Sequence, residues 1–524
     1  MWLSNRLVLP VMVSALAVLA GCSSSSSNTA TPPPGGKFSS SNLNGSYAFS
    51  AIGTDAVGAP FSLAGNLQAN GGGRITGGTL DLNDASLAAP LLAVAITGGS
   101  YTVTADGRGQ ATLNAGQAPV VLDFVLLSNS HALVTRYDGT GTGSGSMDLQ
   151  SAVTQAQLAD SYAFTLGGID AHGNPFATEG AFTLDSVGNI SSGVEDFNDG
   201  GLAYPGLTLS GSVTVGMGGA PGTATLTATN SSSAAPFGTL TFDVYAVDAT
   251  QLKFVEKDTL ALLGGDAFTQ RGASLPSTST VLVFTMAGGV NAPLSVGGLM
   301  TIDGVSAVSN GSEDINENGS TPSAPLSFSG SYTASGAIGG RTLFTLTGFT
   351  GATEFVAYPT ANAGVQLLEL DNGGLLGGAA FAQTAGATLA SSQGYGLGLA
   401  AVNIGGISGS FEEDDVAEFS TTSSGFSGLI DINDEGTLTF DQTFNGSLTL
   451  DSPATGRGVL TSNIFNGVFY AVDSSNVLLL ETDTTQVGTG SLQLQTPGAK
   501  SNLAARRMTV LHLAPAAGKA WRSK

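Results

Sequence analysis

Short runs of alternating apolar and polar residues, separated by glycine-rich turns, recur along most of this 524-residue chain. In the stretch 42–150 the runs are centred near Tyr47, Leu63, Ile75, Tyr101, Ala111, Phe124, Leu133 and Met147. A period of two is typical of half-buried strands, and no amphipathic helix of useful length interrupts the series. The pattern predicts an antiparallel meander of eight strands.

Eight short strands in one unit can close into a small barrel or form a two-sheet sandwich. Consecutive hairpins without a long crossover favour the barrel, and closure also removes strand edges that could aggregate. The expected fold class is therefore all-β, built from antiparallel eight-stranded meander modules. Small barrels are preferred, with two-sheet sandwiches as the alternative.

An acidic motif, Asp-x-Asn followed by Asp or Glu, occurs four times in the chain. Its first aspartates, at intervals of 115, 118 and 117 residues, are Asp81, Asp196, Asp314 and Asp431. Each copy continues with a Gly-Ser pair and ends on a glutamine. Between these markers three copies have an arginine beside glycine, whereas the second copy has Gly222 there; the arginines are Arg108, Arg341 and Arg457. We therefore predict four tandem β-modules, at 42–150, 158–270, 280–383 and 392–495.

Composition and charge limit the partners of these modules. An apolar fraction of 42% with 75 glycines fits folded β-modules with many turns. All 39 acidic residues lie between Lys37 and Gln495 with only 9 of the 16 basic residues, so this part carries 9 − 39 = −30. Such a surface repels phosphate backbones, and we expect no nucleic-acid partner.

The N-terminus carries an export signal. Arg6 precedes an apolar run, 7–20, that is too short to span a bilayer, and the run leads into Leu19-Ala20-Gly21-Cys22. This quartet resembles the lipobox of bacterial lipoproteins. The resemblance implies that the signal peptide 1–21 is removed and that Cys22, the single cysteine, is acylated, with palmitate as one acyl chain. With Ser23 next, it also implies a lipid-anchored protein of the cell outer membrane or cell surface.

Two further segments flank the modules. Residues 22–41 are rich in serine, threonine and proline and predict a tether between the lipid anchor and the first module. Residues 496–524 hold six basic residues and no acidic one. They predict a basic C-terminal tail that is frayed, with a tail folded back on the acidic modules or in contact with anionic envelope polymers as the alternatives.

The acidic motifs have two interpretations. Asp and Asn stabilise turns by accepting hydrogen bonds from nearby backbone N–H groups. Their oxygens are also hard ligands for calcium, although no copy has the full calcium-loop pattern of an EF-hand. A structural turn is favoured, and calcium is the one cofactor considered. The metal ligands would be Asp196, Asn198 and Asp199, followed by Asp431, Asn433 and Asp434.

Other titratable residues point away from catalysis. Acidic pairs that recur late in three modules are interpreted as solvated strand ends: Glu256 and Asp258, Glu369 and Asp371, and Glu481 and Asp483. The run from Glu412 to Asp415 is interpreted as a solvated loop, with an added cation site as the alternative. His172 is expected in a turn. The few histidines lie in different modules and no nucleophile elbow is present, so we expect no enzyme.

Taken together, these features predict a lipid-anchored cell-envelope protein with a structural, adhesive or multivalent binding role. Its partners would be the membrane, through Cys22, and an envelope polymer, glycan or surface protein. An alternative is a carrier that holds a small apolar ligand inside each barrel. An envelope hydrolase is a third option.

Overall fold

The computed structural model describes residues 31–499 except 35, 217–219, 231–235, 336–337, 351, 362–363, 407–408 and 453. The described part folds into four consecutive closed antiparallel barrels of eight strands each. The predicted fold class is confirmed, with barrels rather than sandwiches. The signal peptide, Cys22 and the predicted basic tail from residue 500 onward lie outside the described residues.

The strands follow one another around each barrel in sequence order, and the first strand pairs with the last. Barrel 1 consists of β1 (Asn44–Asp55), β2 (Pro60–Asn70), β3 (Arg74–Asp84), β4 (Leu91–Val103), β5 (Arg108–Ala115), β6 (Val120–Leu126), β7 (His131–Arg136) and β8 (Gly141–Leu149). Barrel 2 consists of β9 (Ser161–Asp170), β10 (Pro175–Leu184), β11 (Ile190–Asp199), β12 (Leu202–Thr214), β13 (Gly222–Thr229), β14 (Thr239–Asp248), β15 (Gln251–Glu256) and β16 (Ala261–Thr269). All eight strand centres predicted in the first module fall within β1–β8.

The second half of the chain repeats this order. Barrel 3 consists of β17 (Thr280–Gly288), β18 (Leu294–Ile302), β19 (Ala307–Glu317), β20 (Leu326–Ala334), β21 (Thr342–Thr347), β22 (Glu354–Pro359), β23 (Gly364–Glu369) and β24 (Leu376–Ala382). Barrel 4 consists of β25 (Gly394–Gly406), β26 (Gly409–Thr421), β27 (Gly425–Asp434), β28 (Thr437–Leu450), β29 (Arg457–Ser462), β30 (Asn466–Ala471), β31 (Asn476–Glu481) and β32 (Gln486–Leu494). Three short 3-10 helices complete the described elements: η1 (Ser40–Asn42), η2 (Gln155–Leu158) and η3 (Ile338–Gly340).

The recurring Gly-Ser pair has a steric cause. A Cβ atom on Gly99, Gly211, Gly330 or Gly446 would lie 1.8–2.2 Å from a carbonyl oxygen of the next strand. Each contact is to a threonine carbonyl on the fifth strand of the same barrel: Thr112, Thr225, Thr345 or Thr461. Any side chain would force the fourth and fifth strands apart, so glycine is required at this point of every barrel.

Large side chains fill the barrel interiors. Each barrel has its own core of buried aromatic and aliphatic residues, as in barrel 1 with Phe49, Phe61 and Phe124. In barrel 3, the space among Phe284, Phe328 and Phe349 amounts to about 10 Å³. Eight-stranded barrels of this kind are just wide enough for side chains to fill, so these cores act as structural cores.

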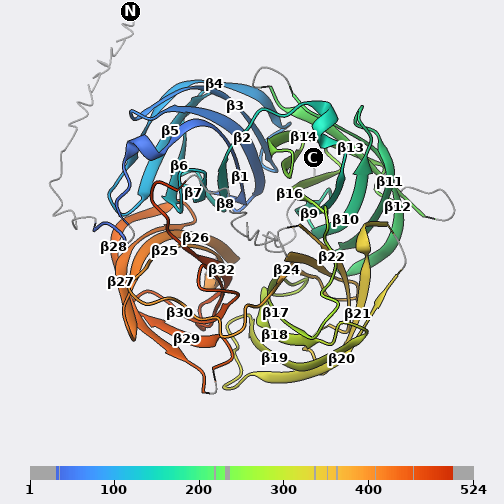
Figure 1. Ribbon diagram of the computed structural model, residues 1–524. Coiled ribbons are helices and arrows are strands. Elements are labelled where there is room, and N and C mark those ends of the chain that lie inside the picture. Colours follow the sequence, from blue (N-terminus) through green and yellow to red (C-terminus); the bar gives the residue numbers. More distant parts are fainter. Residues whose placement is uncertain are drawn as a thin grey trace, which may run out of the picture.

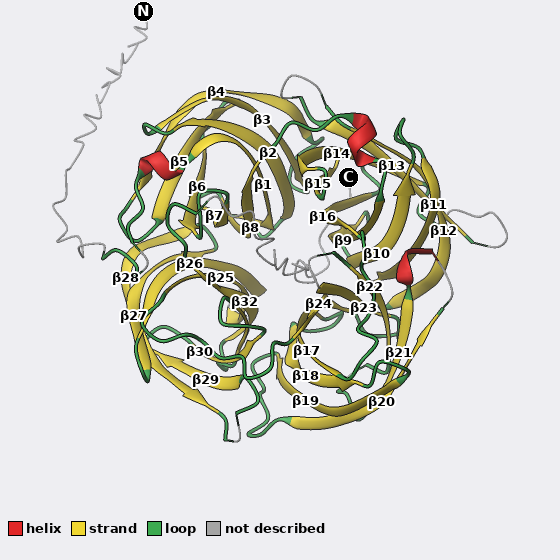
Figure 2. Ribbon diagram, viewed as in Figure 1, coloured by secondary structure: helices red, strands yellow, loops and turns green. Residues whose placement is uncertain are grey.

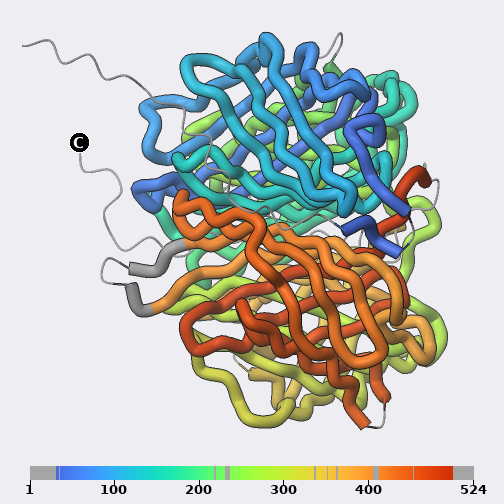
Figure 3. Tube along the Cα trace, turned by 90° about the vertical axis from the view of Figure 1, so that its left-hand side faces the viewer, coloured from blue at the N-terminus to red at the C-terminus, as the bar shows by residue number. Residues whose placement is uncertain are grey.

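The four barrels are arranged in a ring, with barrel 4 beside barrel 1 (Figure 1). Figure 2 shows that strands make up almost the whole ring, and in the side view of Figure 3 barrels 1 and 4 lie against each other. A small apolar cluster joins each neighbouring pair of barrels. At the junction of barrels 1 and 4, Val125, Leu127 and Leu133 pack against Val416. The tandem array is thus closed on itself.

Within the part of the chain that the structure describes, no helix is long and apolar enough to cross a membrane.

Candidate functional site: the interfaces between barrels

The first aspartate of the acidic motif lies at the interface with the following barrel. Asp196, near the end of β11, is fully buried and accepts a hydrogen bond of 2.7 Å from Arg341 Nε in barrel 3. It also contacts the hydroxyl of Tyr358, on β22 of the same barrel. Asp314 repeats the arrangement toward barrel 4, with Arg457 Nε at 2.7 Å and the Tyr470 hydroxyl at 2.5 Å. The motif therefore joins one barrel to the next.

The fourth copy of the motif closes the ring. Asp431 in barrel 4 accepts a hydrogen bond of 2.7 Å from Arg108 Nη1 in barrel 1. Arg108 also donates to Asp441 of barrel 4 at 2.8 Å and to its neighbour Asp106 at 3.1 Å. The Tyr137 hydroxyl of barrel 1 adds hydrogen bonds to carbonyls of barrel 4. Barrels 1 and 4 are thus held together by a buried ion-pair network rather than by a short linker.

The interface between barrels 1 and 2 lacks the arginine. Asp81 contacts the Tyr245 hydroxyl at 2.5 Å and the backbone N–H of Ala93. The strand register pairs Gly222 with Val244, as it pairs Gly109 with Phe124 and Gly458 with Phe469. The residues that precede these three glycines therefore occupy equivalent positions in their barrels. Pro221, rather than the expected Gly222, stands at the position of Arg108 and Arg457. Burial raises the pKa of Asp81, which has no arginine partner here.

The asparagine of the motif also bridges barrels. Asn198 Nδ2 donates to the carbonyls of Glu369 and Gly374 in barrel 3, at 3.1 and 2.8 Å. Its Oδ1 accepts the N–H of Gly201, three residues on, which is the turn that the sequence favoured. The equivalent amides bond carbonyls of the following barrel in the same way: Asn83 to Glu256, Asn316 to Glu481 and Asn433 to Arg136.

Replacement of Asn198 by aspartate tests this bridge. The new carboxylate would face the two carbonyl oxygens that the amide now bonds, and an unsatisfied buried polar group costs about 1–3 kcal/mol. We expect Asn198→Asp to lower the free energy of unfolding by at least that amount in urea denaturation. An unchanged free energy of unfolding would show that the asparagine serves only its own turn.

The glutamine at the end of each module makes a third recurring contact. Gln270 Nε2 donates to the carbonyls of Gly339 and Pro359 in barrel 3, at 2.6 and 2.8 Å. Gln150 and Gln383 bond carbonyls of the following barrel in the same way. Gln495 completes the ring with bonds to Asp106 and Leu126 of barrel 1. The recurrence of this glutamine is visible in the sequence, but its contact with the next barrel is not.

Five of the six residues considered as calcium ligands have hydrogen-bond or ion-pair partners within the protein. Asp196 and Asp431 are paired with arginines, and Asn198 and Asn433 bond carbonyls of the next barrel. Asp434 accepts a hydrogen bond from Asn403. Burial raises the pKa of the half-buried Asp199 to about 6. Among the described residues no group of three or more His, Cys, Asp or Glu is placed to hold a metal ion. Calcium binding at these positions stays a prediction.

Two interpretations of acidic residues as solvated are wrong. Glu256, Glu369 and Glu481 are fully buried at the interfaces, because the preceding barrel covers these strand ends. Burial, with a carboxylate two residues away, raises the pKa of Glu369 to about 8. The second residues of the three acidic pairs instead accept hydrogen bonds from backbone N–H groups of their own barrels; they are Asp258, Asp371 and Asp483.

The run from Glu412 to Asp415 is not a loop. It belongs to β26, and Glu412, Asp414 and Asp415 are fully buried. Glu412 and Asp414 lie on the same face of the strand as Val416, which packs against barrel 1, whereas Asp415 faces the interior of barrel 4. Thr142 of barrel 1 donates a hydrogen bond of 2.8 Å to Asp414. Glu412 and Asp414 therefore belong to the interface that closes the ring.

A buried polar cluster links barrels 1 and 2 near the ring's centre. Lys253 has no exposed surface and pairs with Asp148 at 3.2 Å and with Asp266 at 3.5 Å. Its ammonium also donates to Ser146 at 2.7 Å, and His131 Nδ1 lies 2.8 Å from Asp148. Three of these residues, His131, Ser146 and Asp266, line a cavity of about 90 Å³ shared with barrel 4. By contrast, His172 is exposed and bonds Asp170, which confirms its turn position.

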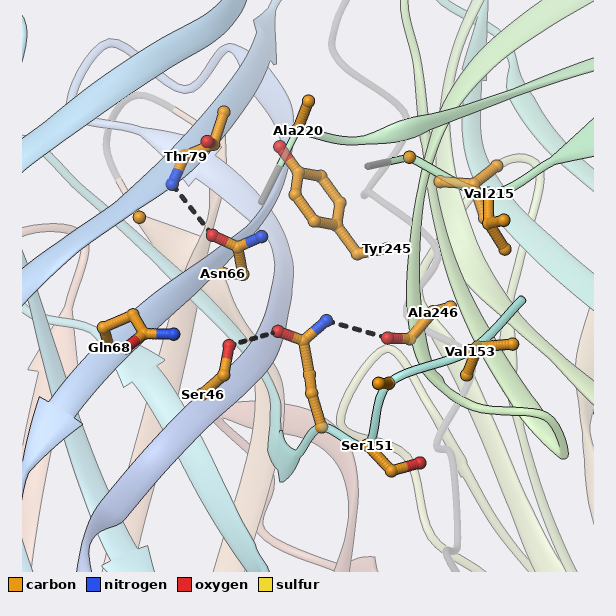
Figure 4. Close-up of a pocket in the computed structure, with 15 residues that line it drawn as sticks. Ser46, Asn66, Gln68, Thr79, Ser151, Val153, Val215, Ala220, Tyr245 and Ala246 are labelled. Carbon is orange, nitrogen blue, oxygen red and sulfur yellow. Dashed lines mark hydrogen bonds between the residues drawn. The ribbon is translucent and has the colours of Figure 1, made fainter. Parts of the chain in front are cut away.

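A much larger cleft lies between barrels 1 and 2, with a volume of about 690 Å³. Figure 4 shows Ser46, Asn66 and Gln68 of barrel 1 on one side and Tyr245 and Val215 of barrel 2 on the other. Gln150 bridges the two barrels: its amide oxygen accepts a hydrogen bond from the Ser46 hydroxyl at 2.7 Å, and its amide nitrogen donates to the Ala246 carbonyl at 2.7 Å. The cleft thus lies at the one interface where the motif aspartate has no arginine.

No protein-family model and no curated protein matches this sequence. Among solved structures, the chain is similar to one titled "The Structure of Intact Ap-TbpB (N and C lobes)". The match has 11% sequence identity and covers 71% of this chain and 86% of that one, with a TM-score of 0.16. So low a score does not indicate a shared arrangement of barrels.

Proposed function

We propose that this protein is a lipid-anchored component of the cell envelope that acts as a rigid, non-enzymatic binding scaffold. The observation that carries the proposal is the closed ring of filled barrels. Because the barrel interiors hold side chains, the surfaces left for a partner are the outside of the ring and the cleft between barrels 1 and 2. This geometry suits a surface protein or an envelope polymer as the partner better than a ligand held inside the barrels.

Attachment to the membrane would come from Cys22 in the lipobox-like quartet at the N-terminus. Two or more acyl chains anchor a protein stably, whereas one chain does so only weakly. The Ser- and Pro-rich stretch after Cys22 would hold the ring off the bilayer. Ser23 supports placement in the outer membrane, and the acidic body supports a partner other than nucleic acid.

The alternatives receive less support. An apolar carrier needs a hollow barrel, whereas Phe284, Phe328 and Phe349 leave only about 10 Å³ inside barrel 3. A hydrolase would need a nucleophile or a pair of carboxyls open to substrate. The carboxyls that recur late in the modules include Glu256, Glu369 and Glu481, and the interfaces bury all three.

The Cys22→Ser variant tests the anchor. We expect the native chain to take up labelled palmitate and to fractionate with membranes, and the variant to lose both properties. Thermal unfolding of the barrels should be unchanged, because position 22 precedes the first strand at Asn44. A variant that still fractionates with the outer membrane would contradict lipid anchoring, and an Arg6→Gln variant serves as the matched control for export.

A further inference from the structure

We propose that the cleft between barrels 1 and 2 binds an uncharged oligosaccharide. This inference rests on the proposed binding function and names its ligand class. The cleft volume of about 690 Å³ falls within the range of about 300–1,000 Å³ that is usual for ligand sites.

The cleft arises where the second module departs from the others. At the three other interfaces an arginine crosses to the motif aspartate of the neighbouring barrel, at distances of 2.7 Å. Pro221 stands at the equivalent position here and has no side chain that could reach Asp81. Thr79, two residues before Asp81 on β3, points to the same face of that strand and lines the cleft. The cleft thus lies at the interface where one module lacks the structural ion pair.

The polar lining consists of neutral hydrogen-bonding groups. These side chains are Ser46, Asn66, Gln68, Thr79, Gln150 and Ser151. Hydroxyl and amide groups offer both donors and acceptors, which is what the hydroxyls of a sugar require, since each of them donates and accepts. The side chains of Gln68 and Ser151 are exposed to solvent, so they can contact a ligand without a rearrangement of the protein.

The opposite side of the cleft is apolar. Val153, Val215, Ala220 and Ala246 line it together with Tyr245. A pyranose ring has polar edges and C–H faces, so one hydrogen-bonding wall and one apolar wall match its two kinds of surface. Figure 4 shows this division, with the amide and hydroxyl groups of barrel 1 facing the valines and Tyr245 of barrel 2.

Charge argues for an uncharged ligand. The lining residues of the cleft include no Lys, Arg, His, Asp or Glu. A sugar bearing carboxylates or sulfates would find no cation there, and the acidic body, at −30 between Lys37 and Gln495, would repel it. A cationic ligand would find no carboxylate in the lining, because Asp81 has no exposed surface and is bonded to Tyr245.

Two measurements test the proposal. The full chain is first probed against an array of neutral and acidic oligosaccharides, and its affinity for the neutral oligomer that binds best is then measured by calorimetry. Ala220→Trp should weaken binding at least tenfold, because residue 220 is exposed on the cleft wall and the indole would fill the space. Val57→Trp is the matched control, since Val57 is 77% exposed in the β1–β2 turn at the other end of the barrel. Its affinity should stay within twofold of the native value.

Pro221→Arg is a second test variant, because it restores the arginine that the other three interfaces have. The new arginine should reach Asp81 as Arg341 reaches Asp196, raising the melting temperature while abolishing sugar binding. Binding to no neutral oligosaccharide, selective binding to acidic ones, or native affinity in Ala220→Trp would overturn the proposal. The Cys22→Ser experiment tests lipid anchoring independently of sugar binding. A wrong ligand class can therefore be distinguished from a wrong proposed function.

Discussion

Replacement of Arg108 by methionine is expected to lower the free energy of unfolding by about 3–5 kcal/mol, the usual cost of removing one partner from a buried ion pair. Methionine keeps an apolar stem of similar length and removes only the guanidinium. Asp431 would then lie buried at the interface without its cation, and Asp106 and Asp441 would lose their ion pairs with the same guanidinium. This interface alone joins the first barrel to the last, so its loss should open the ring.

Urea denaturation of the Arg108→Met variant measures the loss, with Arg74→Met as the matched control. Arg74 is exposed on β3, and its replacement should change the free energy of unfolding by less than about 0.5 kcal/mol. Equal effects of the two substitutions would contradict a role for Arg108 in closing the ring.

Raising the pH from 5 to 8 is expected to destabilise the folded chain by several kcal/mol. Burial raises the pKa of Glu195 and Glu313 to about 7 and that of Glu418 and Glu369 to about 8. In the unfolded chain these groups lose their protons near pH 4.3. Between that pH and about 8 the unfolded state binds fewer protons than the folded state, so stability falls as pH rises. One pKa unit corresponds to about 1.4 kcal/mol per group, and several groups act together.

Chemical denaturation at pH 5 and pH 8 measures this trend, and Glu369→Gln gives it a matched test. The amide cannot ionise, so the variant should be more stable than the native chain at pH 8 and about equally stable at pH 5. The same difference at both pH values, or a native stability that does not fall between them, would contradict the account. Below pH 4 the trend should reverse, because three backbone N–H groups lower the pKa of Asp303 to about 2.

The barrels could be predicted from the sequence because the information is local. Alternation in stretches such as the one around Tyr101 predicts a strand, and a short glycine turn beside Arg108 predicts its antiparallel neighbour. Hairpins that follow one another without a crossover leave few ways to close a sheet. The eight strands of barrel 1 and their order follow from these local signals.

The environment of the acidic residues could not be predicted in the same way. Glu369 lies at a strand end, a place that is usually solvated, and only the approach of barrel 2 buries it. Alternation along a strand distinguishes the interior of a barrel from its outside, but it does not show which part of the outside meets another barrel. For the same reason Asp196 could be assigned to a turn but not to its arginine.

One sequence signal could have revealed the interfaces. The motif aspartate and the final glutamine recur in all four modules, and the arginine and the tyrosine on the sixth strand recur in three modules each, although no module needs them for its own fold. Asp314 is matched with Arg457 and Tyr470 from the next copy, not from its own. Side chains that recur in tandem copies without a local partner are candidates for contacts between neighbouring copies.

Closure of the ring also changes the expected mode of binding. Four barrels on flexible linkers could each bind weakly and gain avidity. A rigid ring fixes the barrels relative to one another, and one interface differs from the rest through Pro221. The geometry therefore favours one defined site between barrels 1 and 2 over four equivalent sites, and the search for a ligand should begin there.

Small-angle X-ray scattering of the Cys22→Ser chain in solution tests the closed ring most directly. A single compact body of about 470 residues has a radius of gyration of about 23 Å, and the open centre of a ring raises this only slightly. Four barrels of about 13 Å each in a flexible row would give roughly 35 Å. We predict a value near 25 Å that rises in the Arg108→Met variant. A native value above about 30 Å would contradict the closed ring and the assignment of the acidic motifs as contacts between barrels.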